Sequence, residues 1–209
     1  MPASGTVQIA LIDYGAGNLS SVRKGFGAAG AGVFTPATPA GLMNAGAIVV
    51  PGVGHFGTTA ALTADWRRAI TNLVREGVPL LGICVGLQWL FEGSDEAPDI
   101  PGLNAIRGRC TRLPSGQKVP HVGWNTLEVL RSSRLLQGVA NRSFAYFTHS
   151  YAAPVTCECA ATTTHGVPFA SVVERSNVYG VQFHPEKSGA GGIRLLQNFV
   201  AIAGGQAGS

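Results

Sequence analysis

Short apolar runs alternate with longer amphipathic stretches through the first half of the 209-residue chain. The runs that predict buried strands lie at residues 7–12, 48–50 and 78–83. The stretches with helical periodicity lie at residues 19–29 and 60–75. This strand–helix–strand order is typical of a parallel sheet covered by helices. Asp13, Gly52 and Cys84 fall at or just after the predicted strand ends, where such sheets carry functional residues.

The second half of the chain is richer in strand patterns, and no internal repeat interrupts it. Its predicted strands lie at residues 126–130, 144–151, 155–163, 169–174 and 178–183. A helix is expected at residues 192–202, a turn-rich loop at 94–101 and a frayed tail at 204–209. The length suits one α/β domain over residues 1–209, with extra strands in its second half.

Composition narrows the class of protein. Hydrophobic residues make up 45% of the chain and charged residues 12%, which suggests that a partner covers part of the surface. The net charge of +4 is dispersed, with one loose cluster at Arg107, Arg109, Arg112 and Lys118. This cluster is either a solvated face or a contact for a phosphate-bearing substrate or an acidic partner. No basic stripe interleaved with aromatic residues predicts nucleic-acid binding.

The four cysteines contain no C-x-x-C pair, so reduced thiols are expected. Cys157 and Cys159 are predicted on one strand with both thiols on the same face, without zinc-like companions. Residues 1–6 lack the positive start of a secretory signal, and no apolar run approaches the roughly 18 residues of a membrane span. We therefore expect a cytoplasmic protein without a metal site.

Gly82-Ile83-Cys84-Val85-Gly86 has the form of a nucleophile elbow, in which a strand turns sharply into a helix and the middle side chain projects from the tip. Residues 78–81 would form the strand, and a helical pattern covers residues 87–91. A helix N-terminus favours the thiolate, which is the nucleophilic form of cysteine. Most free cysteines are small buried hydrophobes instead, but the flanking glycines favour the functional interpretation here.

His184-Pro185-Glu186 follows the last predicted strand. Pro185 ends that strand, so His184 lies at its tip, and residues two apart in extended backbone point the same way. The Glu186 carboxylate can then orient one imidazole nitrogen while the other faces a thiol. A lone histidine or glutamate is usually structural or solvated, but together with Cys84 they predict a base, its orienting acid and a nucleophile.

Two backbone N–H groups are expected to hold the oxyanion formed when Cys84 attacks a carbonyl carbon. Val85 follows the nucleophile directly, and Gly52 or Val53 lies at a neighbouring strand end. Residues 51–54 are otherwise only a turn, and their glycines also permit a peptide orientation that aims no N–H at the oxyanion. Residues 15–20 imitate a dinucleotide-binding turn but have Ser20 in place of the third glycine, so no cofactor is predicted.

Together with Gly180-Val181-Gln182-Phe183 before His184, these motifs resemble the class I, or triad, glutamine amidotransferases. Further segments resemble, in the same order, the glutaminase subunits of imidazole glycerol phosphate synthases within that family. These segments are residues 13–19, 51–54, 121–125, 146–151 and 187–188. The resemblance covers essentially the whole chain, although Val85 and Leu87 stand where Leu and Met are more usual.

The resemblance implies a three-layer, flavodoxin-like α/β fold with a mostly parallel central sheet flanked by helices. It implies hydrolysis of L-glutamine to glutamate and ammonia, with Gln88, His149, Ser150 and Tyr151 lining the glutamine site beside residues 52–54. It implies neither cofactor nor metal.

The resemblance also implies a partner. Ammonia would pass through a channel to a (β/α)₈-barrel cyclase subunit, which forms imidazole glycerol phosphate and AICAR in histidine biosynthesis. The two subunits would form a heterodimer, with Asn18, Trp124 and Lys187 at the interface.

Three other interpretations stay open. A sister amidotransferase subunit, such as that of pyridoxal phosphate synthase, is the nearest, and residues 121–125 argue against it. A cysteine peptidase or related hydrolase would share the triad but need no partner. A non-catalytic interaction module on this fold would not need Cys84. Glutamate release from glutamine, measured with and without a cyclase subunit, separates these possibilities.

Overall fold

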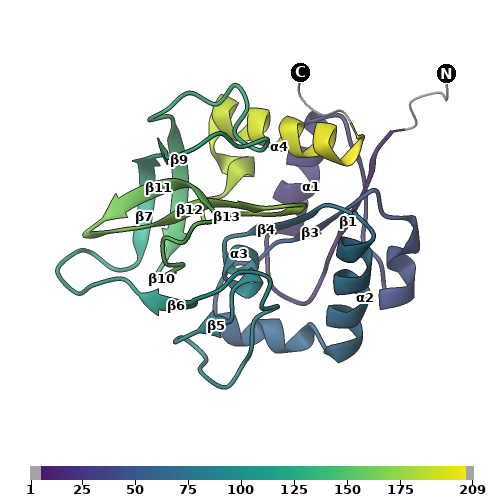
Figure 1. Ribbon diagram of the computed structural model, residues 1–209, viewed down its shortest axis with the longest axis horizontal. Helices are drawn as coiled ribbons and strands as arrows, with labels where there is room; N and C mark the ends of the chain where they lie inside the picture. The colour runs from purple at the N-terminus through teal and green to yellow at the C-terminus, as the bar shows by residue number, and fades with distance from the viewer. Residues whose placement is uncertain (1–5, 206–209) are drawn as a thin grey trace.

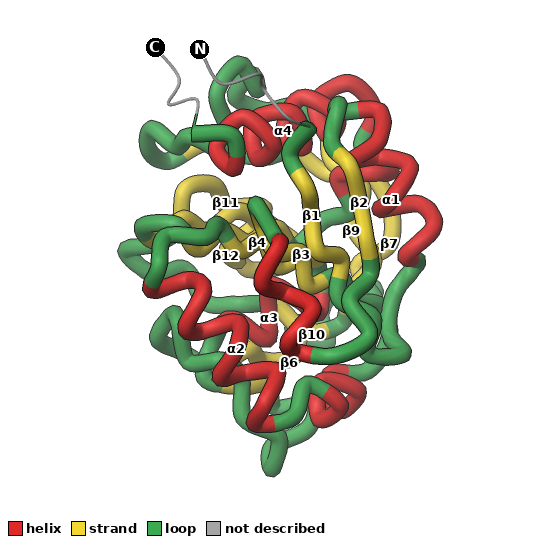
Figure 2. Tube along the Cα trace, turned by 90° about the vertical axis from the view of Figure 1, so that its right-hand side faces the viewer, coloured by secondary structure: helices red, strands yellow, loops and turns green. Residues whose placement is uncertain are grey.

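The computed structural model describes residues 6–205 as three layers (Figure 1). Helices α1 (Leu19–Ala28) and α4 (Gly189–Ala203) cover one face of an eight-stranded sheet, and α2 (Ala64–Arg75) and α3 (Val85–Leu90) cover the other. Figure 2 shows α4 and α2 on opposite sides of the strands between them. The predicted three-layer α/β architecture is confirmed.

The main sheet has the strand order β2-β1-β3-β4-β13-β12-β11-β8. The first five of these strands are parallel to one another, and the last three are added antiparallel. Its strands are β1 (Gln8–Leu11), β2 (Gly32–Phe34), β3 (Ala47–Val50), β4 (Leu80–Ile83), β8 (Glu128–Val129), β11 (Cys159–His165), β12 (Val167–Arg175) and β13 (Val178–Val181). The predicted extra strands in the second half therefore extend one edge of the parallel sheet.

Two smaller sheets lie beside the main one. β7 (His121–Thr126) and β9 (Phe144–His149) form an antiparallel pair. The other contains β5 (Gly93–Ser94), β6 (Arg109–Arg112) and β10 (Tyr151–Ala152).

The central strands β3, β4 and β13 are apolar along their whole length and buried at every position. Continuous apolar runs of this kind suit parallel strands, because helices cover both faces of the sheet. The register pairs Val50 with Gly82, and Val181 with Ile83. The carboxyl ends of the three strands consequently lie side by side.

Several predicted boundaries are wrong. Residues 155–158 precede β11, which begins only at Cys159, because a turn forms at residues 157–158. Cys157 is exposed and Cys159 is buried, so their thiols do not share a face. The helix expected from residue 60 begins at Ala64, because a 3₁₀ turn over Phe56–Ala61 precedes it.

The short strands β2, β5 and β6 were not predicted, since two to four residues carry too little periodicity. The strand expected at residues 126–130 is divided between the end of β7 and β8. Gly204 and Gly205 form a turn after α4, and the expectations for residues 1–5 and 206–209 lie outside the described part of the chain. Within residues 6–205, no helix has the length and apolar character needed to cross a membrane.

Candidate active site

Cys84 stands at the sharp turn between β4 and α3, with a φ of 55°. Residues other than glycine seldom adopt this left-handed backbone, and nucleophile elbows are a recognised exception. A Cβ on Gly86 would lie 1.8 Å from the carbonyl oxygen of Val50, and one on Gly82 would lie 2.4 Å from that of Gly86. The predicted strand–turn–helix is confirmed, and close backbone approach explains both glycines.

His184 and Glu186 form a buried pair after β13. The His184 Nδ1 lies 3.0 Å from the Glu186 Oε1, and the side chains are only 3% and 2% exposed. The predicted contact is present, but its predicted geometry is wrong. Pro185–Lys187 form a 3₁₀ turn, so the turn, rather than extended backbone, brings the carboxylate back to the ring. The backbone N–H of His184 donates to Tyr146 O at 2.9 Å, which holds the turn beside β9.

The surroundings of His184 favour its protonated form. Burial opposes the charge, but the favourable interactions with Cys84 and Glu186 outweigh burial and raise the pKa of His184 from 6.5 to about 9. Its Nε2, the nitrogen not facing Glu186, is buried without a formed hydrogen bond. The arrangement suits an imidazolium that gives up a proton when a reacting group enters.

A cavity of about 180 Å³ opens beside the Cys84 sulfur. It brings together six of the predicted site residues from two separate parts of the chain, residues 84–88 and 149–151. Its lining residues are Gly54, Cys84, Val85, Gln88, Glu96, Pro120, Thr148, His149, Ser150 and Tyr151. His184 and Glu186 are not among these residues, although His184 interacts with Cys84.

Gln88 lies on α3 within this cavity and is 2% exposed. Its Nε2 donates to the carbonyl oxygen of Tyr151 at 2.8 Å. Its Oε1 is buried without a hydrogen-bond partner. A buried amide oxygen left unpaired is energetically unfavourable, so it suits a donor supplied by a ligand.

Glu96 is a member of the cavity wall that the sequence analysis missed. It is the only carboxylate among the lining residues, and its Oε2 accepts a hydrogen bond from Phe56 N–H at 2.7 Å. Arg109 anchors the same loop, through Asp95 Oδ1 at 2.8 Å and the carbonyl oxygen of Pro98 at 2.9 Å. The only sequence signal was an acidic residue in the loop expected at 94–101. One member of the basic cluster thus has a structural role, while Arg107, Arg112 and Lys118 are exposed.

The two predicted oxyanion donors are not assembled in this conformation. The carbonyl oxygen of Gly52 accepts the Val85 N–H at 3.4 Å. Because a trans peptide points its N–H opposite to its C=O, the Val53 N–H faces away from Val85. Val53 itself is absent from the cavity lining, where Gly54 lies instead. The Gly52–Val53 peptide therefore has the orientation in which no second N–H points at the oxyanion.

Two neutral histidines lie on one side of the cavity, with His149 in its lining and His121 in contact with His149. His121 Nδ1 lies 3.1 Å from His149 Nε2, and His149 Nδ1 lies 2.9 Å from Tyr151 O. Burial lowers the pKa of His149 to about 3, and burial with the nearby His165 lowers that of His121 to about 4. The described residues contain no group of three or more side chains placed to hold a metal ion.

Two of the predicted interface residues flank Tyr146 on β9. The Trp124 side chain is 56% exposed, and its ring meets that of Tyr146 edge to face at 5.9 Å. Tyr146 also donates its N–H to Ser188 Oγ at 3.0 Å, next to the exposed Lys187. Trp124 and Lys187 consequently belong to one surface.

Asn18 is exposed at the start of α1. Its Oδ1 accepts the Ser21 N–H at 3.2 Å, so the side chain caps the helix. The same helix packs against the catalytic turn, since a Cβ on Gly25 would lie 3.2 Å from Glu186 Cβ. Asn18 therefore caps the helix while its side chain stays exposed.

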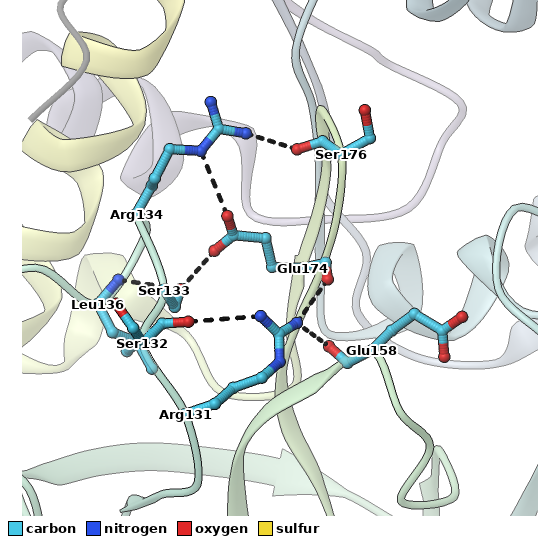
Figure 3. Close-up of polar contacts among 8 residues, drawn as sticks. All are labelled: Arg131, Ser132, Ser133, Arg134, Leu136, Glu158, Glu174 and Ser176. Atoms are coloured by element: carbon cyan, nitrogen blue, oxygen red, sulfur yellow. Dashed lines mark hydrogen bonds and ion pairs between the residues drawn. The ribbon is translucent and has the colours of Figure 1, made fainter.

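A second cavity, of about 320 Å³, is lined by Arg131 and Arg134. Both arginines make polar contacts that connect parts of the fold (Figure 3). Arg131 Nη2 donates to the carbonyl oxygens of Glu158 at 2.9 Å and Glu174 at 2.7 Å. Arg134 pairs with the Glu174 carboxylate at 3.3 Å and donates to Ser176 O at 2.6 Å. These contacts fasten the segment after β8 to the β11–β13 region.

The sequence matches the family Glutamine amidotransferase class-I over residues 10–203. It is 45% identical over 195 residues to imidazole glycerol phosphate synthase subunit HisH of Methanothermobacter thermautotrophicus, covering 93% of this chain and 98% of that protein. It is 46% identical over 197 residues to the subunit of the same name from Thermococcus kodakarensis, covering 91% and 98%.

Solved structures agree on the fold. A crystal structure of a glutamine amidotransferase superposes with a TM-score of 0.74 at 19% identity, covering 94% of this chain and 98% of that one. PurLQS from Thermotoga maritima gives a TM-score of 0.76 at 16% identity, covering 93% and 98%. At such identities the likeness supports the fold alone.

Proposed function

This chain belongs to the class I glutamine amidotransferases, and on that basis we propose that it is the glutamine-hydrolysing subunit of an imidazole glycerol phosphate synthase. The near-full-length relatives at 45% and 46% identity carry that subunit's name. The observation that supports hydrolysis most directly is Cys84 on an elbow, beside the buried His184–Glu186 pair and a cavity. The chain thus acts in histidine biosynthesis.

The proposed reaction begins with attack of the Cys84 thiolate on the carboxamide carbon of glutamine. His184 gives its proton to the departing ammonia, which leaves a glutamyl thioester on Cys84. The neutral imidazole then takes a proton from water, and the resulting hydroxide equivalent releases glutamate. Glu186 holds the ring at Nδ1 so that Nε2 faces the reacting atoms.

The cavity offers groups for recognising the rest of the substrate. The Glu96 carboxylate supplies the negative charge that the α-ammonium of glutamine requires. The unpaired Oε1 of Gln88 can accept one of the substrate's N–H groups. His149, Ser150 and Tyr151 form the opposite wall.

The isolated subunit is proposed to be a poor glutaminase. The Gly52 carbonyl occupies Val85 N–H, so a peptide rotation at Gly52-Val53 must occur before two donors face the oxyanion. A missing oxyanion donor typically lowers the rate by about 10²–10³. Partner binding is the proposed trigger, which would restrict glutamine hydrolysis to the assembled enzyme.

The partner is proposed to be a (β/α)₈-barrel cyclase subunit that receives ammonia through a channel, forming a heterodimer with this chain. The exposed apolar side chains of Val122, Trp124 and Phe144 on the β7–β9 pair support a protein contact there. Lys187 and Asn18 would take part at its edges. The four free cysteines fit a reducing compartment, which we propose is the cytoplasm.

Glutamate release from glutamine tests the proposal. The isolated chain should release glutamate slowly, and a cyclase subunit with its nucleotide ligand should accelerate release about 10²–10³-fold. Cys84→Ala should be inactive in both conditions. Full activity of the isolated chain would contradict the proposed switch, and absence of glutaminase activity in the complex would contradict the function.

A further inference from the structure

Gln182 is a buried side chain that the proposed reaction leaves without a role. It is 0% exposed, and its Nε2 donates to the Cys84 sulfur at 3.7 Å. Its Oε1 accepts from Gln88 Nε2 at 3.3 Å. The amide therefore lies between the nucleophile and the wall of the cavity.

The sheet register places Gln182 beside the nucleophile. β13 pairs with β4 so that Val181 is opposite Ile83, and Cys84 N–H donates to Val181 O at 2.8 Å. The N–H of Gln182 donates to Ser171 O on β12 at 3.0 Å. Backbone hydrogen bonds on both sides thus fix the position of this amide.

The surroundings also fix which end of the amide faces the sulfur. The carbonyl oxygen of Tyr151 can only accept, so Gln88 must turn its NH₂ group toward it. That NH₂ group also faces Gln182, which must then present its oxygen to Gln88. The NH₂ group of Gln182 is left facing Cys84.

The chain of hydrogen bonds, with donors and acceptors fixed in the same way, continues toward the β7–β9 pair. Tyr151 O also faces His149 Nδ1, so that nitrogen carries the proton and Nε2 accepts from His121 Nδ1. His121 Nε2 in turn accepts from Asn125 Nδ2 at 3.3 Å. The lowered pKa values of both histidines favour the neutral rings that this order requires.

A side-chain donor to the Cys84 sulfur matters because a backbone carbonyl near the sulfur is an acceptor. The carbonyl oxygen of Thr148 lies 3.8 Å from the Cys84 sulfur and suits the protonated thiol. An N–H donor favours the thiolate instead. We propose that Gln182 is a catalytic residue that donates to the Cys84 sulfur and stabilises its thiolate, with Gln88 and Tyr151 O holding its amide in that orientation.

This inference rests on the proposed function only in taking Cys84 as the nucleophile, and alkylation tests it without glutamine. Gln182→Met removes the donor while keeping an unbranched side chain of similar length. The rate of Cys84 alkylation by iodoacetamide at pH 7 should fall about tenfold, and its pH profile should move upward by about one unit. Subtracting the rate of Cys84→Ala removes the contribution of the other thiols.

Ser171→Ala is the matched control. It removes a buried hydroxyl that donates to Ala161 O at 3.0 Å on the neighbouring strand, without contact to Cys84. Its alkylation rate should equal that of the unmodified chain. In the complex with a cyclase subunit, Gln182→Met should lower kcat for glutamine about tenfold with little change in KM. An unchanged pH profile in a folded Gln182→Met protein would overturn the inference.

If Gln182→Met does not fold, the side-chain amide resonance of Gln182 in the ¹⁵N-labelled unmodified chain decides the question. The resonance should shift as Cys84 titrates, and the shift should be lost in Cys84→Ala, where His184 still titrates. A resonance that behaves alike in the two proteins would overturn the inference. Altered alkylation in a complex that hydrolyses no glutamine would refute the proposed function while leaving the Gln182 contact intact.

Discussion

At the scale of single residues, the proposed chemistry depends on a proton held at His184. The ring is buried, and contact with Cys84 and Glu186 raises the pKa of His184 to about 9 despite that burial. Because the folded value lies above the ordinary value of 6.5, this contact stabilises the fold fully below about pH 6.5. The contribution is lost as the pH rises through about 9.

Glu186→Gln should lower the pKa of His184, because it removes the carboxylate that favours the imidazolium. An opposite charge at this distance typically accounts for about 1–3 units. The imidazole C–H resonance of His184, followed by NMR against pH, measures the change. A midpoint that stays near 9 would mean that Glu186 does not hold the proton there.

The activity of the complex provides a second readout of the same substitution. Glu186→Gln should impair glutamine hydrolysis less than His184→Ala, since it disturbs the orientation of the base without removing it. Equal losses would contradict the orienting role of Glu186.

At the scale of the elements, the elbow depends on the close approach of β3, β4 and α3. Gly86→Ala should destabilise the chain by about 1–3 kcal/mol or more. The Cβ of the alanine would lie 1.8 Å from the rigid backbone oxygen of Val50. Urea unfolding measures the change.

Gly27→Ala is the control for this substitution. Gly27 lies in α1, is exposed and has open space where a Cβ would stand, so alanine there should stabilise the helix by about 0.5–1 kcal/mol. Similar effects of the two substitutions would show that contact at the elbow does not explain Gly86.

The sequence predicted this region well because each of its signals is local. An apolar run, two glycines and a cysteine define β4 and the start of α3 within a few residues. The same holds for the strand before His184, although the turn at Pro185 replaced the expected extended backbone. Proximity of His184 to Cys84 followed from the combination of motifs rather than from either one alone.

Features that depend on contacts distant in the chain could not be predicted in this way. Glu96 joins the cavity because Arg109 and Phe56 hold its loop, and neither contact has a sequence pattern. The His121–His149 contact arises from pairing of β7 with β9. Residues 155–158 carried a strand pattern, but a turn formed before Cys159.

At the scale of the whole molecule, ammonia made at Cys84 has to be used elsewhere. The family Glutamine amidotransferase class-I matches residues 10–203. The apolar β7–β9 surface is the contact that we propose for the protein that uses the ammonia. Free ammonia is protonated in neutral water, so hydrolysis is useful only when the two sites are joined.

Trp124→Ala in the complex separates transfer of ammonia from its production. Trp124 is exposed and lies outside the cavity that contains Cys84, so glutamine hydrolysis should continue. Product formed per glutamine consumed should fall if this surface joins the subunits. Lys187→Ala, on the other side of Tyr146, serves as a second variant of the same kind.

The most direct measurement uses a complex carrying Cys84→Ala and supplies either glutamine or ammonium salt at alkaline pH. We expect no imidazole glycerol phosphate from glutamine, because the nucleophile is missing, but product formation from ammonia, which bypasses that step. Product from glutamine would contradict the role of Cys84. Failure with ammonia in a verified complex would contradict the division of labour between the two subunits.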